Sequence, residues 1–425
     1  MSRSSYSTST SSSQQQNIKD FSTPEASPQN KNVKIKSVQD LRSRQLPEYV
    51  SSPTSKLHNL IWTEPIQNVF IVKKPWQPHV RDAMIKFISF LHKNYPSCNV
   101  IVERDVADEI LLDFHSFPLD GNEPPHVLYT GEPNEIIGKT DLLVTLGGDG
   151  TILRGVSLFS NTVVPPVLSF SLGTLGFLLP YDFSHHVSAF KEVYSSRAKA
   201  LHRTRVECHI VKDNESSAGI HAMNDVVLHR GSSPSLATLD IYIDGEFLTG
   251  TTGDGVVFAT PTGSTAYSLS SGGSIVNPLV PSILLTPICP RSLSFRPLIL
   301  PSTTHIMVKI GSKNNSQSSV KLSIDGVSQT HLSKGDEIHV ISETGTIYLP
   351  HAKRPLDNDF ERERLEEEEF VDIRKKAQTV DRNKYKGIWC IAKSENDWVR
   401  GINELLGFNS GFKGFNRTEV DTNPE

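Results

Sequence analysis

Apolar residues in the first half of the chain follow two alternating patterns. Short continuous runs rich in branched side chains, such as residues 66–72, predict buried strands. After Pro78 the apolar residues recur three or four positions apart, which predicts an amphipathic helix. The buried face of this helix would carry Val80, Met84, Phe87, Ile88 and Leu91.

The same alternation continues to about residue 200. Residues 99–102, 141–146 and 167–170 have strand patterns, and residues 107–114 have a helical one. Strands that alternate with helices form a largely parallel sheet covered on both faces. We therefore predict an α/β amino-terminal domain with a parallel, Rossmann-like sheet, whose ligands bind beyond the carboxyl ends of the strands.

Beyond residue 201 the apolar residues alternate with period two. Leu239, Ile241 and Ile243 lead into Asp244-Gly245, a dipeptide typical of a tight hairpin. Further strand patterns occupy residues 255–259, 305–310, 320–324, 337–341 and 346–349. Many short strands separated by turn residues predict a second, β-rich domain with a sandwich-like arrangement of layers.

The carboxyl-terminal tail contains one more helical pattern. Ser394 and Asp397 have the spacing of a capping box, and Gly407 is the expected stop. One face of this helix carries Trp398, Ile402, Leu405 and Leu406. An apolar face of this size needs a partner surface, so we expect the helix to dock back on a preceding domain.

These patterns divide the chain into six segments. They are a disordered tail or transit segment (1–30), an N-terminal extension (31–65), the α/β domain (66–200), the β-rich domain (201–350), a charged insertion (351–385), and a C-terminal helix with its tail (386–425). The charge within residues 361–369 is best explained by a solvated insertion without chemistry.

Composition and charge narrow the choice of partners. The chain has 425 residues and a formal net charge of −4, so nothing points to nucleic acid or to an anionic membrane, and small ligands are favoured. Its four cysteines lie far apart without a Cys-x-x-Cys pair, which is typical of a reducing compartment and not of a zinc cluster or a disulfide framework. No apolar run approaches the roughly 20 residues that a membrane helix needs.

The first residues have the composition of a weak transit peptide or of a disordered tail. No acidic residue precedes Asp20, Ser and Thr are frequent, and Arg3 and Lys19 are the only bases. Because transit peptides are usually rich in arginine, composition alone favours the disordered tail.

Residues 147–151 carry most of the chemical information. Their sequence, Gly-Gly-Asp-Gly-Thr, follows a strand pattern and precedes an apolar run. Glycines at the start of a helix let backbone N–H groups approach an anion, which predicts phosphate binding. A carboxylate there would repel phosphate, so Asp149 is better explained as a catalytic base than as a helix cap, the alternative role. The chain lacks a P-loop, a Rossmann G-x-G-x-x-G, a G-x-S-x-G elbow and an H-E-x-x-H pair.

Other polar segments offer groups for a nucleotide. The loop 171–177 contains two glycines and ends in Phe177, which is suited to stacking on a base, although a phenylalanine is more often part of a core than a ligand contact. The pair Asn224-Asp225 can grip two ribose hydroxyls or simply begin a strand. Residues 261–273 supply many hydroxyl groups and no charge, in an ordered or a flexible loop. Asp254 lies in a predicted turn and alone indicates no function.

Residues 147–151, the pair Asn224-Asp225 and residues 261–273, in this order, resemble the NAD kinase family. The resemblance covers about residues 66–349, and together these motifs are highly specific. Residues 287–297 are similar to a further stretch of the family. The flanking segments 32–36, 52–62 and 396–408 resemble a branch of the family, the mitochondrial NADH kinases of budding yeasts.

The resemblance implies an ATP-dependent kinase that phosphorylates the adenosine ribose 2′-hydroxyl of NADH or NAD⁺. It implies a dinucleotide site at the domain junction, Mg²⁺ bound with ATP and not by dedicated protein ligands, a homo-oligomer (dimer or tetramer), and the mitochondrial matrix. Asp149 matches the family's catalytic base. The matching binding residues are Gly148, Gly150, Thr151, Phe177, Asn224, Asp225, Asp254, Thr265, Tyr267, Ser268 and Ser270.

One position departs from the family pattern. Ser171 stands where most members have Asn, and a serine lacks the paired amide donors of that residue. Contacts near this position, and with them the choice between NADH and NAD⁺, are therefore expected to differ. Two rival functions remain at this point: a lipid or diacylglycerol kinase, which needs an apolar acceptor site, and a non-catalytic NAD(H)-sensing module, which leaves Asp149 unexplained.

Overall fold

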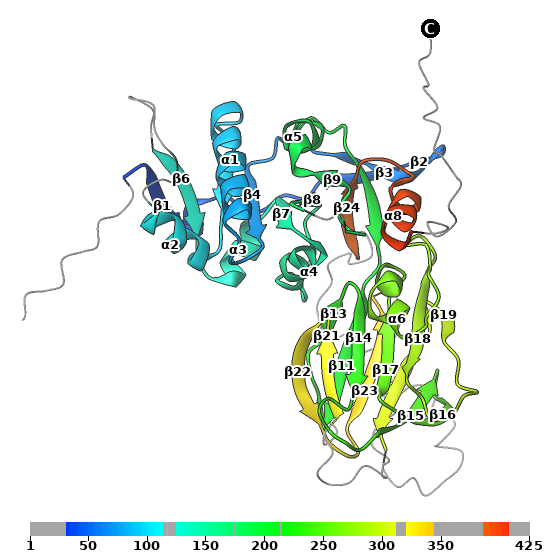
Figure 1. Ribbon diagram of the computed structural model, residues 1–425. Coiled ribbons are helices and arrows are strands. Elements are labelled where there is room, and N and C mark those ends of the chain that lie inside the picture. The colour runs from blue at the N-terminus through cyan, green and yellow to red at the C-terminus, as the bar shows by residue number, and fades with distance from the viewer. Residues whose placement is uncertain are drawn as a thin grey trace, which may run out of the picture.

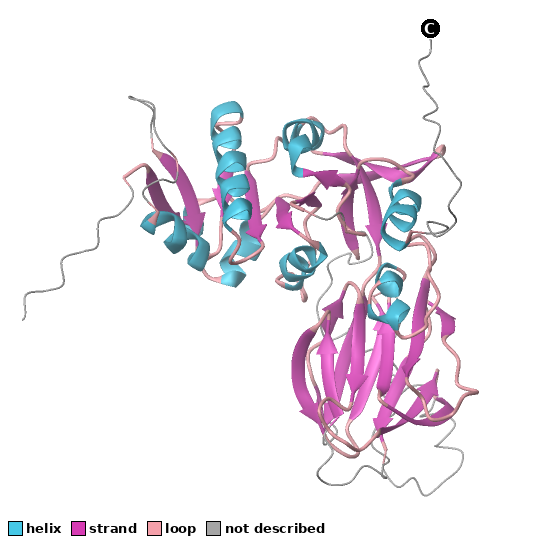
Figure 2. Cartoon of the chain, in the orientation of Figure 1, coloured by secondary structure: helices cyan, strands magenta, loops and turns pink. Residues whose placement is uncertain are grey.

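The computed structural model describes residues 31–113, 117, 125–173, 176–212, 215–311, 320–343 and 386–407. Helices cover a sheet in the first part of the chain, and a body built almost entirely of strands follows (Figures 1 and 2). Within the described ranges, no helix is both long and apolar enough to cross a membrane.

The first domain is organised around an 11-stranded sheet. Its strands are β1 (Val33–Ser37), β2 (Glu48–Ser52), β3 (Ser55–Ile61), β4 (Asn68–Lys73), β5 (Asn99–Ile101), β6 (His126–Thr130), β7 (Leu142–Gly147), β8 (Val167–Ser171), β9 (Tyr181–Asp182), β10 (Lys199–Arg203) and β24 (Ile388–Ala392). Their order is β1-β6-β5-β4-β7-β8-β24-β10-β3-β2, with β9 beside β8. The strands from β1 to β8 in this order are parallel, whereas β10, β3 and β2 are antiparallel to their neighbours.

Five helices cover the two faces of this sheet. They are α1 (Pro78–Asn94), α2 (Arg104–Leu112), α3 (Pro133–Lys139), α4 (Asp149–Ser157) and α5 (His186–Tyr194). Buried residues of α1, α2 and α5 belong to one apolar cluster, and those of α3 and α4 belong to another. Every residue of β4 and β7 is buried, as expected for central parallel strands.

Helix α1 follows the predicted pattern closely. Pro78 occupies its first turn, where the missing N–H costs nothing, and all five predicted apolar residues are buried. Burial of one such side chain contributes about 1.5–3 kcal/mol. Helix α2 begins three residues earlier than the predicted helical pattern and ends at Leu112.

The two ends of the chain contribute more to this sheet than the sequence indicated. The expected N-terminal extension, residues 31–65, supplies β1 at one edge and β2 and β3 at the other. The expected tail supplies β24, which lies between β8 and β10 (Figure 1). The α/β domain therefore draws on three separate parts of the chain.

The second domain is an antiparallel β-sandwich. Its strands are β11 (Val206–Lys212), β12 (Glu215–Ser216), β13 (Ile220–Ala222), β14 (Asp225–His229), β15 (Ala237–Ile243), β16 (Glu246–Gly253), β17 (Gly255–Ala259), β18 (Ser282–Ile288), β19 (Leu298–Pro301), β20 (Ile306–Ile310), β21 (Val320–Ile324), β22 (Val327–Leu332) and β23 (Glu337–Ser342). One sheet has the order β12-β11-β23-β20-β15-β16, with β13 beside β11, and the other has the order β19-β18-β17-β14-β21-β22. Inward-facing residues of both sheets form one core.

The predicted hairpin at Asp244-Gly245 is present between β15 and β16. Both residues have positive φ, 50° and 88°, as a two-residue turn of this kind requires. The predicted strand at residues 346–349 lies outside the described residues. The predicted fold class, an α/β domain followed by a β-rich sandwich, is confirmed.

The C-terminal helix α8 (Asp397–Leu406) lies beside β24, where the two domains meet (Figure 1). Gly407 ends it in the left-handed conformation, as predicted. The capping differs from the prediction, because Asn396 and not Ser394 is the N-cap residue. Asp397 nevertheless turns back, and its Oδ2 accepts the N–H groups of Lys393 and Ser394, each at 2.8 Å.

Candidate active site

The glycine loop joins the carboxyl end of β7 to the first turn of α4. At Gly147, where φ is 155°, an added Cβ would lie 2.3 Å from Thr151 Oγ1. Only glycine fits this position. The N–H of Thr151 donates to the carbonyl of Gly148 at 2.8 Å, whereas N–H groups at a helix start that lack such a partner can bind an anion. Gly148, Gly150 and Thr151 therefore lie where the sequence predicted a phosphate-binding loop.

Asp149 connects this loop to the second glycine loop. Its Oδ2 accepts the N–H of Phe177 and its Oδ1 accepts the N–H of Leu178, both at 3.1 Å. An added Cβ at Gly176 would lie only 2.1 Å from Asp149 Oδ1. Across the sheet Ser171 pairs with Gly147, so the two loops are neighbours.

Burial raises the pKa of Asp149 above its usual value. The two amide N–H groups and the positive charge of Arg203 act in the opposite direction but do not cancel the effect. A carboxylate with a raised pKa is a stronger base than an ordinary aspartate. The environment of Asp149 thus suits the abstraction of a proton from a hydroxyl group.

Arg203, at the end of β10, was not predicted as a site residue. Its side chain is buried, its Nη1 donates to Thr262 Oγ1 at 3.2 Å, and its Nε has no partner among the described residues. This guanidinium therefore lies between Asp149 of the first domain and the loop 261–273 of the second. An isolated arginine in a strand carries no sequence pattern that would have revealed it.

Asp225 begins β14, and Asn224 directly precedes it. The side-chain Oδ1 of Asn224 is buried and lacks a hydrogen-bond partner in the described part of the chain. A buried acceptor without a donor is costly, so this oxygen is free to accept a hydrogen bond from a ligand or from water. Burial and, second, the neighbouring Asp325 raise the pKa of Asp225 to about 7.

The loop 261–273 is ordered, so the alternative of a flexible loop does not apply. Gly263 packs so closely on the segment that leads into β14 that an added Cβ would lie 2.0 Å from the carbonyl oxygen of Asn224. Its N–H binds Thr260 Oγ1 at 3.0 Å, and Ser264 Oγ accepts the N–H of Val276 at 2.9 Å. The loop is thereby fixed against the Asn224-Asp225 pair.

The predicted binding residues in this loop have different surroundings. Ser268 is fully buried, and its Oγ forms a hydrogen bond with Thr286 Oγ1 of β18 at 2.8 Å, which holds the loop against the sheet. Thr265 Oγ1 donates to the carbonyl of Thr262 at 3.3 Å. Tyr267 and Ser270 are exposed and available to a ligand.

Asp254 directly precedes β17, at the opposite end of this strand from the loop 261–273. Its Oδ1 accepts the Nε of Arg230 at 2.6 Å. Burial raises the pKa of Tyr267, and the charges of Cys289, Asp254 and Asp225 raise this pKa further. In the sheet Asp225 pairs with Ala259, at the other end of β17 from Asp254, so the structure does not bring these two predicted residues into contact, although the charges of both act on Tyr267.

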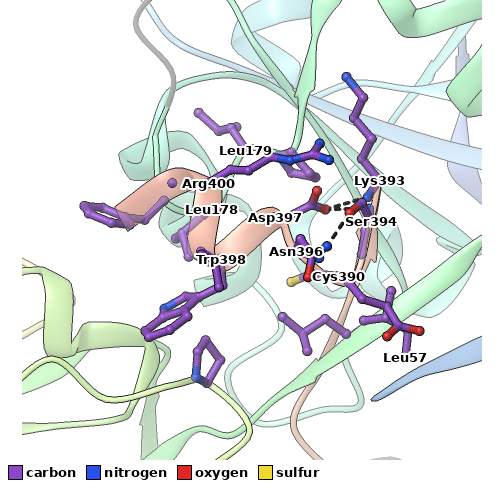
Figure 3. A pocket seen from close by; sticks show the side chains of 18 of the residues that line it. Leu57, Leu178, Leu179, Cys390, Lys393, Ser394, Asn396, Asp397, Trp398 and Arg400 are labelled. Carbon is purple, nitrogen blue, oxygen red and sulfur yellow. Dashed lines mark hydrogen bonds between the residues drawn. The ribbon is translucent and has the colours of Figure 1, made fainter. Parts of the chain in front are cut away.

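A cavity of about 300 Å³ lies beneath α8, and its lining includes Gly176, Phe177 and Leu178 of the second glycine loop but not Asp149. Phe177, Leu178 and Arg203 line its inner side, and residues 277–279 of the second domain line another. Figure 3 shows its outer wall, which α8 forms with Asp397 turned toward Lys393 and Ser394 and with Trp398 and Arg400 along the helix. Such a volume is at the lower end of the range for small-molecule sites.

No three His, Cys, Asp or Glu side chains of the described ranges are grouped so as to hold a metal ion. The site as a whole combines a phosphate-type glycine loop, a buried carboxylate and a facing polar loop from a second domain. This combination defines a nucleotide-binding phosphotransferase site.

Known protein families agree with this definition. The ATP-NAD kinase N-terminal domain matches residues 69–198, and the ATP-NAD kinase C-terminal domain matches residues 223–349. These matches cover more than half of the chain. The protein belongs to the NAD kinase family, as its motifs predicted.

Its relatives include two fungal mitochondrial enzymes. The mitochondrial NADH kinase POS5 of Saccharomyces cerevisiae is 61% identical over 387 residues, which are 90% of this chain and 90% of the relative. The mitochondrial NADH kinase pos5 of Schizosaccharomyces pombe is 41% identical over 390 residues, 89% of this chain and 86% of the relative. A crystal structure of yeast NADH kinase complexed with NADH matches with a TM-score of 0.76 and 58% identity, over 90% of this chain and 100% of that chain.

Proposed function

We propose that this protein is an ATP-dependent NADH kinase, which also accepts NAD⁺ and forms NADPH or NADP⁺. The observation that carries the proposal is the position of Asp149. A buried carboxylate lies within a phosphate-type glycine loop, and Arg203, whose charge acts on this carboxylate, donates a hydrogen bond to Thr262 of the loop 261–273. The identity of 61% with a mitochondrial NADH kinase supports the choice of substrate.

In the proposed reaction, the adenosine ribose 2′-hydroxyl attacks the γ-phosphorus of ATP in line with the departing ADP oxygen. Asp149 takes the hydroxyl proton as the new oxygen–phosphorus bond forms. The N–H groups at the start of α4, with Gly148, Gly150 and Thr151, neutralise charge on the phosphates. Base catalysis of this kind is worth about 10²–10⁴ in rate.

Mg²⁺ enters this scheme with ATP. The described residues contain no cluster of acidic or imidazole ligands, and the loop N–H groups bind anions, not cations. We therefore assign the ion to the triphosphate oxygens, where it would neutralise charge that develops on ADP.

The dinucleotide would occupy the junction of the two domains. Asn224 Oδ1 and Asp225 accept hydrogen bonds from ribose hydroxyls or from the adenine amine. The other residues that we assign to the site are Phe177, Asp254, Thr265, Tyr267, Ser268 and Ser270. Among them, Ser268 supports the loop and the others line the site. The polar character of this surface favours a dinucleotide over the lipid acceptor of a diacylglycerol kinase.

The test is Asp149→Asn, with Asp105→Asn as the matched control. Asp105 also occupies the first turn of a helix that follows a parallel strand, but it lies in α2, away from the loop. We expect Asp149→Asn to keep the fold and the dinucleotide affinity while turnover falls about 10²-fold or more. Near-normal turnover of ATP and NADH by this variant would exclude Asp149 as the base. A wild-type protein that binds NADH without consuming ATP would instead favour the sensing module.

We further propose that NADH is the better substrate. The two dinucleotides differ only in the nicotinamide ring, so a tenfold preference in kcat/KM requires about 1.4 kcal/mol of differential binding. Ser171 and the uncharged residues 265–271 are the candidates for this difference. Ser171→Asn should shift the kcat/KM ratio toward NAD⁺, and equal or higher kcat/KM for NAD⁺ in the wild type would contradict the preference.

The relatives' names support a mitochondrial location, and we propose that the protein works in the matrix as a homo-oligomer, dimer or tetramer. There it would supply NADPH for antioxidant and biosynthetic reactions. Fractionation checks the location, and recovery of the uncleaved chain in the cytosol would contradict it. Light scattering of the purified protein gives the oligomer size.

A further inference from the structure

The hairpin between β21 and β22 reaches across to the start of β14. Its turn is Asp325-Gly326, with positive φ values of 48° and 78°. These angles are typical of a two-residue hairpin turn. The turn of this hairpin is therefore explained by its backbone alone, but the direction of the Asp325 side chain is not.

The carboxylate of Asp325 accepts three consecutive backbone N–H groups. Its Oδ2 binds the N–H of Met223 at 2.8 Å, and its Oδ1 binds those of Asn224 at 2.7 Å and Asp225 at 3.1 Å. In return the N–H of Asp325 donates to the carbonyl of Asp225 at 2.9 Å. Four hydrogen bonds thus join one turn residue to the segment that carries the two proposed dinucleotide ligands.

We infer that Asp325 is a positioning residue for dinucleotide binding, which fixes the backbone of Asn224 and Asp225 so that their side chains face the ligand. The inference rests on the proposed function, because it takes the Asn224-Asp225 pair as the dinucleotide grip. Asp325 itself does not touch the ligand. It acts through the three peptide groups that it binds.

Stability alone does not explain a carboxylate at this place. Asp325 is adjacent to a second carboxylate, Asp225, and two such groups at close range raise the energy of both ionised forms. Arg205 is the positive group that acts on Asp325. An uncharged residue would avoid the repulsion, so the acceptor capacity of a carboxylate, up to about four lone pairs, is what the position requires.

The other Asp-Gly hairpin of the sandwich provides the comparison. Asp244 has the same conformation in the turn between β15 and β16, and its N–H likewise donates to a neighbouring carbonyl, that of His305, at 2.9 Å. Its carboxylate accepts only one backbone N–H, from His305 at 2.8 Å. Asp244 therefore shares the turn geometry of Asp325 but supports no predicted site residue.

The experiment compares Asn and Gly substitutions at both turns. Asn and Gly tolerate positive φ, so each substitution preserves the hairpin. In Asp325→Asn the amide nitrogen faces a backbone N–H, which removes at least one of the three bonds. In Asp325→Gly all three are lost. Asp244→Asn and Asp244→Gly repeat the same chemical changes away from the site.

Each variant is purified and titrated with NADH alone, and its kinetics with ATP and NADH and its unfolding temperature are measured. We expect both Asp325 variants to raise the NADH dissociation constant and KM by about tenfold or more, while KM for ATP changes less than about threefold. Both Asp244 variants should bind NADH as the wild type does, even if their unfolding temperatures fall equally. If the Gly variant does not fold, the Asn variant decides.

Equal NADH affinity in the Asp325 and Asp244 variants would overturn the inference. So would a parallel loss of NADH and ATP binding at Asp325, because that result indicates general loosening of the fold. A wild-type protein that binds NADH but does not phosphorylate it would refute the kinase proposal alone, and the binding comparison would still test Asp325.

Discussion

Replacement of Gly176 by alanine tests the contact between the two glycine loops. The added Cβ would lie 2.1 Å from Asp149 Oδ1 and 2.6 Å from its Cγ. Because atoms do not approach this closely, either the carboxylate rotates away or the loop that carries Phe177 and Leu178 retreats. Both movements break the two hydrogen bonds that hold Asp149.

The size of the effect follows from these contacts. Hydrogen bonds to a charged group contribute about 1.5–3 kcal/mol each, so loss of the two bonds weakens the docking of the loop by roughly 3–6 kcal/mol. Relief of the overlap also displaces the carboxylate by about 1 Å, and a displacement of that size at a reacting group costs about 10²-fold in rate. We therefore expect kcat of Gly176→Ala to fall about 100-fold.

The assay is steady-state turnover of ATP and NADH, followed by NADPH formation, with the unfolding temperature of each variant measured in parallel. Gly138→Ala in α3 is the control, because an added Cβ there meets nothing within 4 Å. Alanine in that helix should leave kcat unchanged. If kcat of Gly176→Ala stays within about threefold of the wild-type value, position 176 does not need to lack a side chain for Asp149 to act as the base.

Two further predictions concern the second domain. In Gly263→Ala the added Cβ would lie 2.0 Å from the backbone oxygen of Asn224, which cannot rotate away as a side chain can. We therefore expect the free energy of unfolding in urea to fall by about 1–3 kcal/mol and NADH binding to weaken. The pKa of Asp225 is raised to about 7, so below that pH its carboxyl group is protonated when no ligand is bound. A ribose hydroxyl that donates a hydrogen bond needs the ionised carboxylate, so binding releases this proton. NADH affinity should therefore rise as pH increases to about 7 and then level off, and calorimetry in buffers of different ionisation heat should detect proton release; in Asp225→Asn both effects should disappear. The same raised pKa means that the contribution of this group to the stability of the unliganded protein falls between the usual carboxyl pKa and about pH 7.

The chemistry that lies within one stretch of sequence was predictable, and the chemistry that depends on distant contacts was not. The glycine loop and Asp149 are consecutive residues, so their pattern indicated a phosphate site without knowledge of the fold. Arg203 and Asp325 are single charged residues in a strand and a turn, and charged side chains in such places are usually exposed to solvent. Their importance arises only when residues about 60 and 100 positions away reach them.

The fold shows the same division. Continuous apolar runs with helices between them predicted the parallel strands β4, β5, β7 and β8, because local periodicity determines such elements. The place of β24 in the sheet was missed. Its five residues, Ile-Trp-Cys-Ile-Ala, are too few to show a period, and their neighbours in the sheet come from far along the chain.

The position of β24 also sets the order in which the protein can be completed. Cys390 pairs with Val167, and Ala392 pairs with Lys199, so the gap between β8 and β10 stays open until nearly the whole chain has been synthesised. A ribosome adds about 5–20 residues per second, which leaves the first domain without its inner strand for the time needed to make the second. The N-terminal domain therefore cannot close before the C-terminal segment has left the ribosome. This late closure delays the native state of the first domain until β24 has arrived.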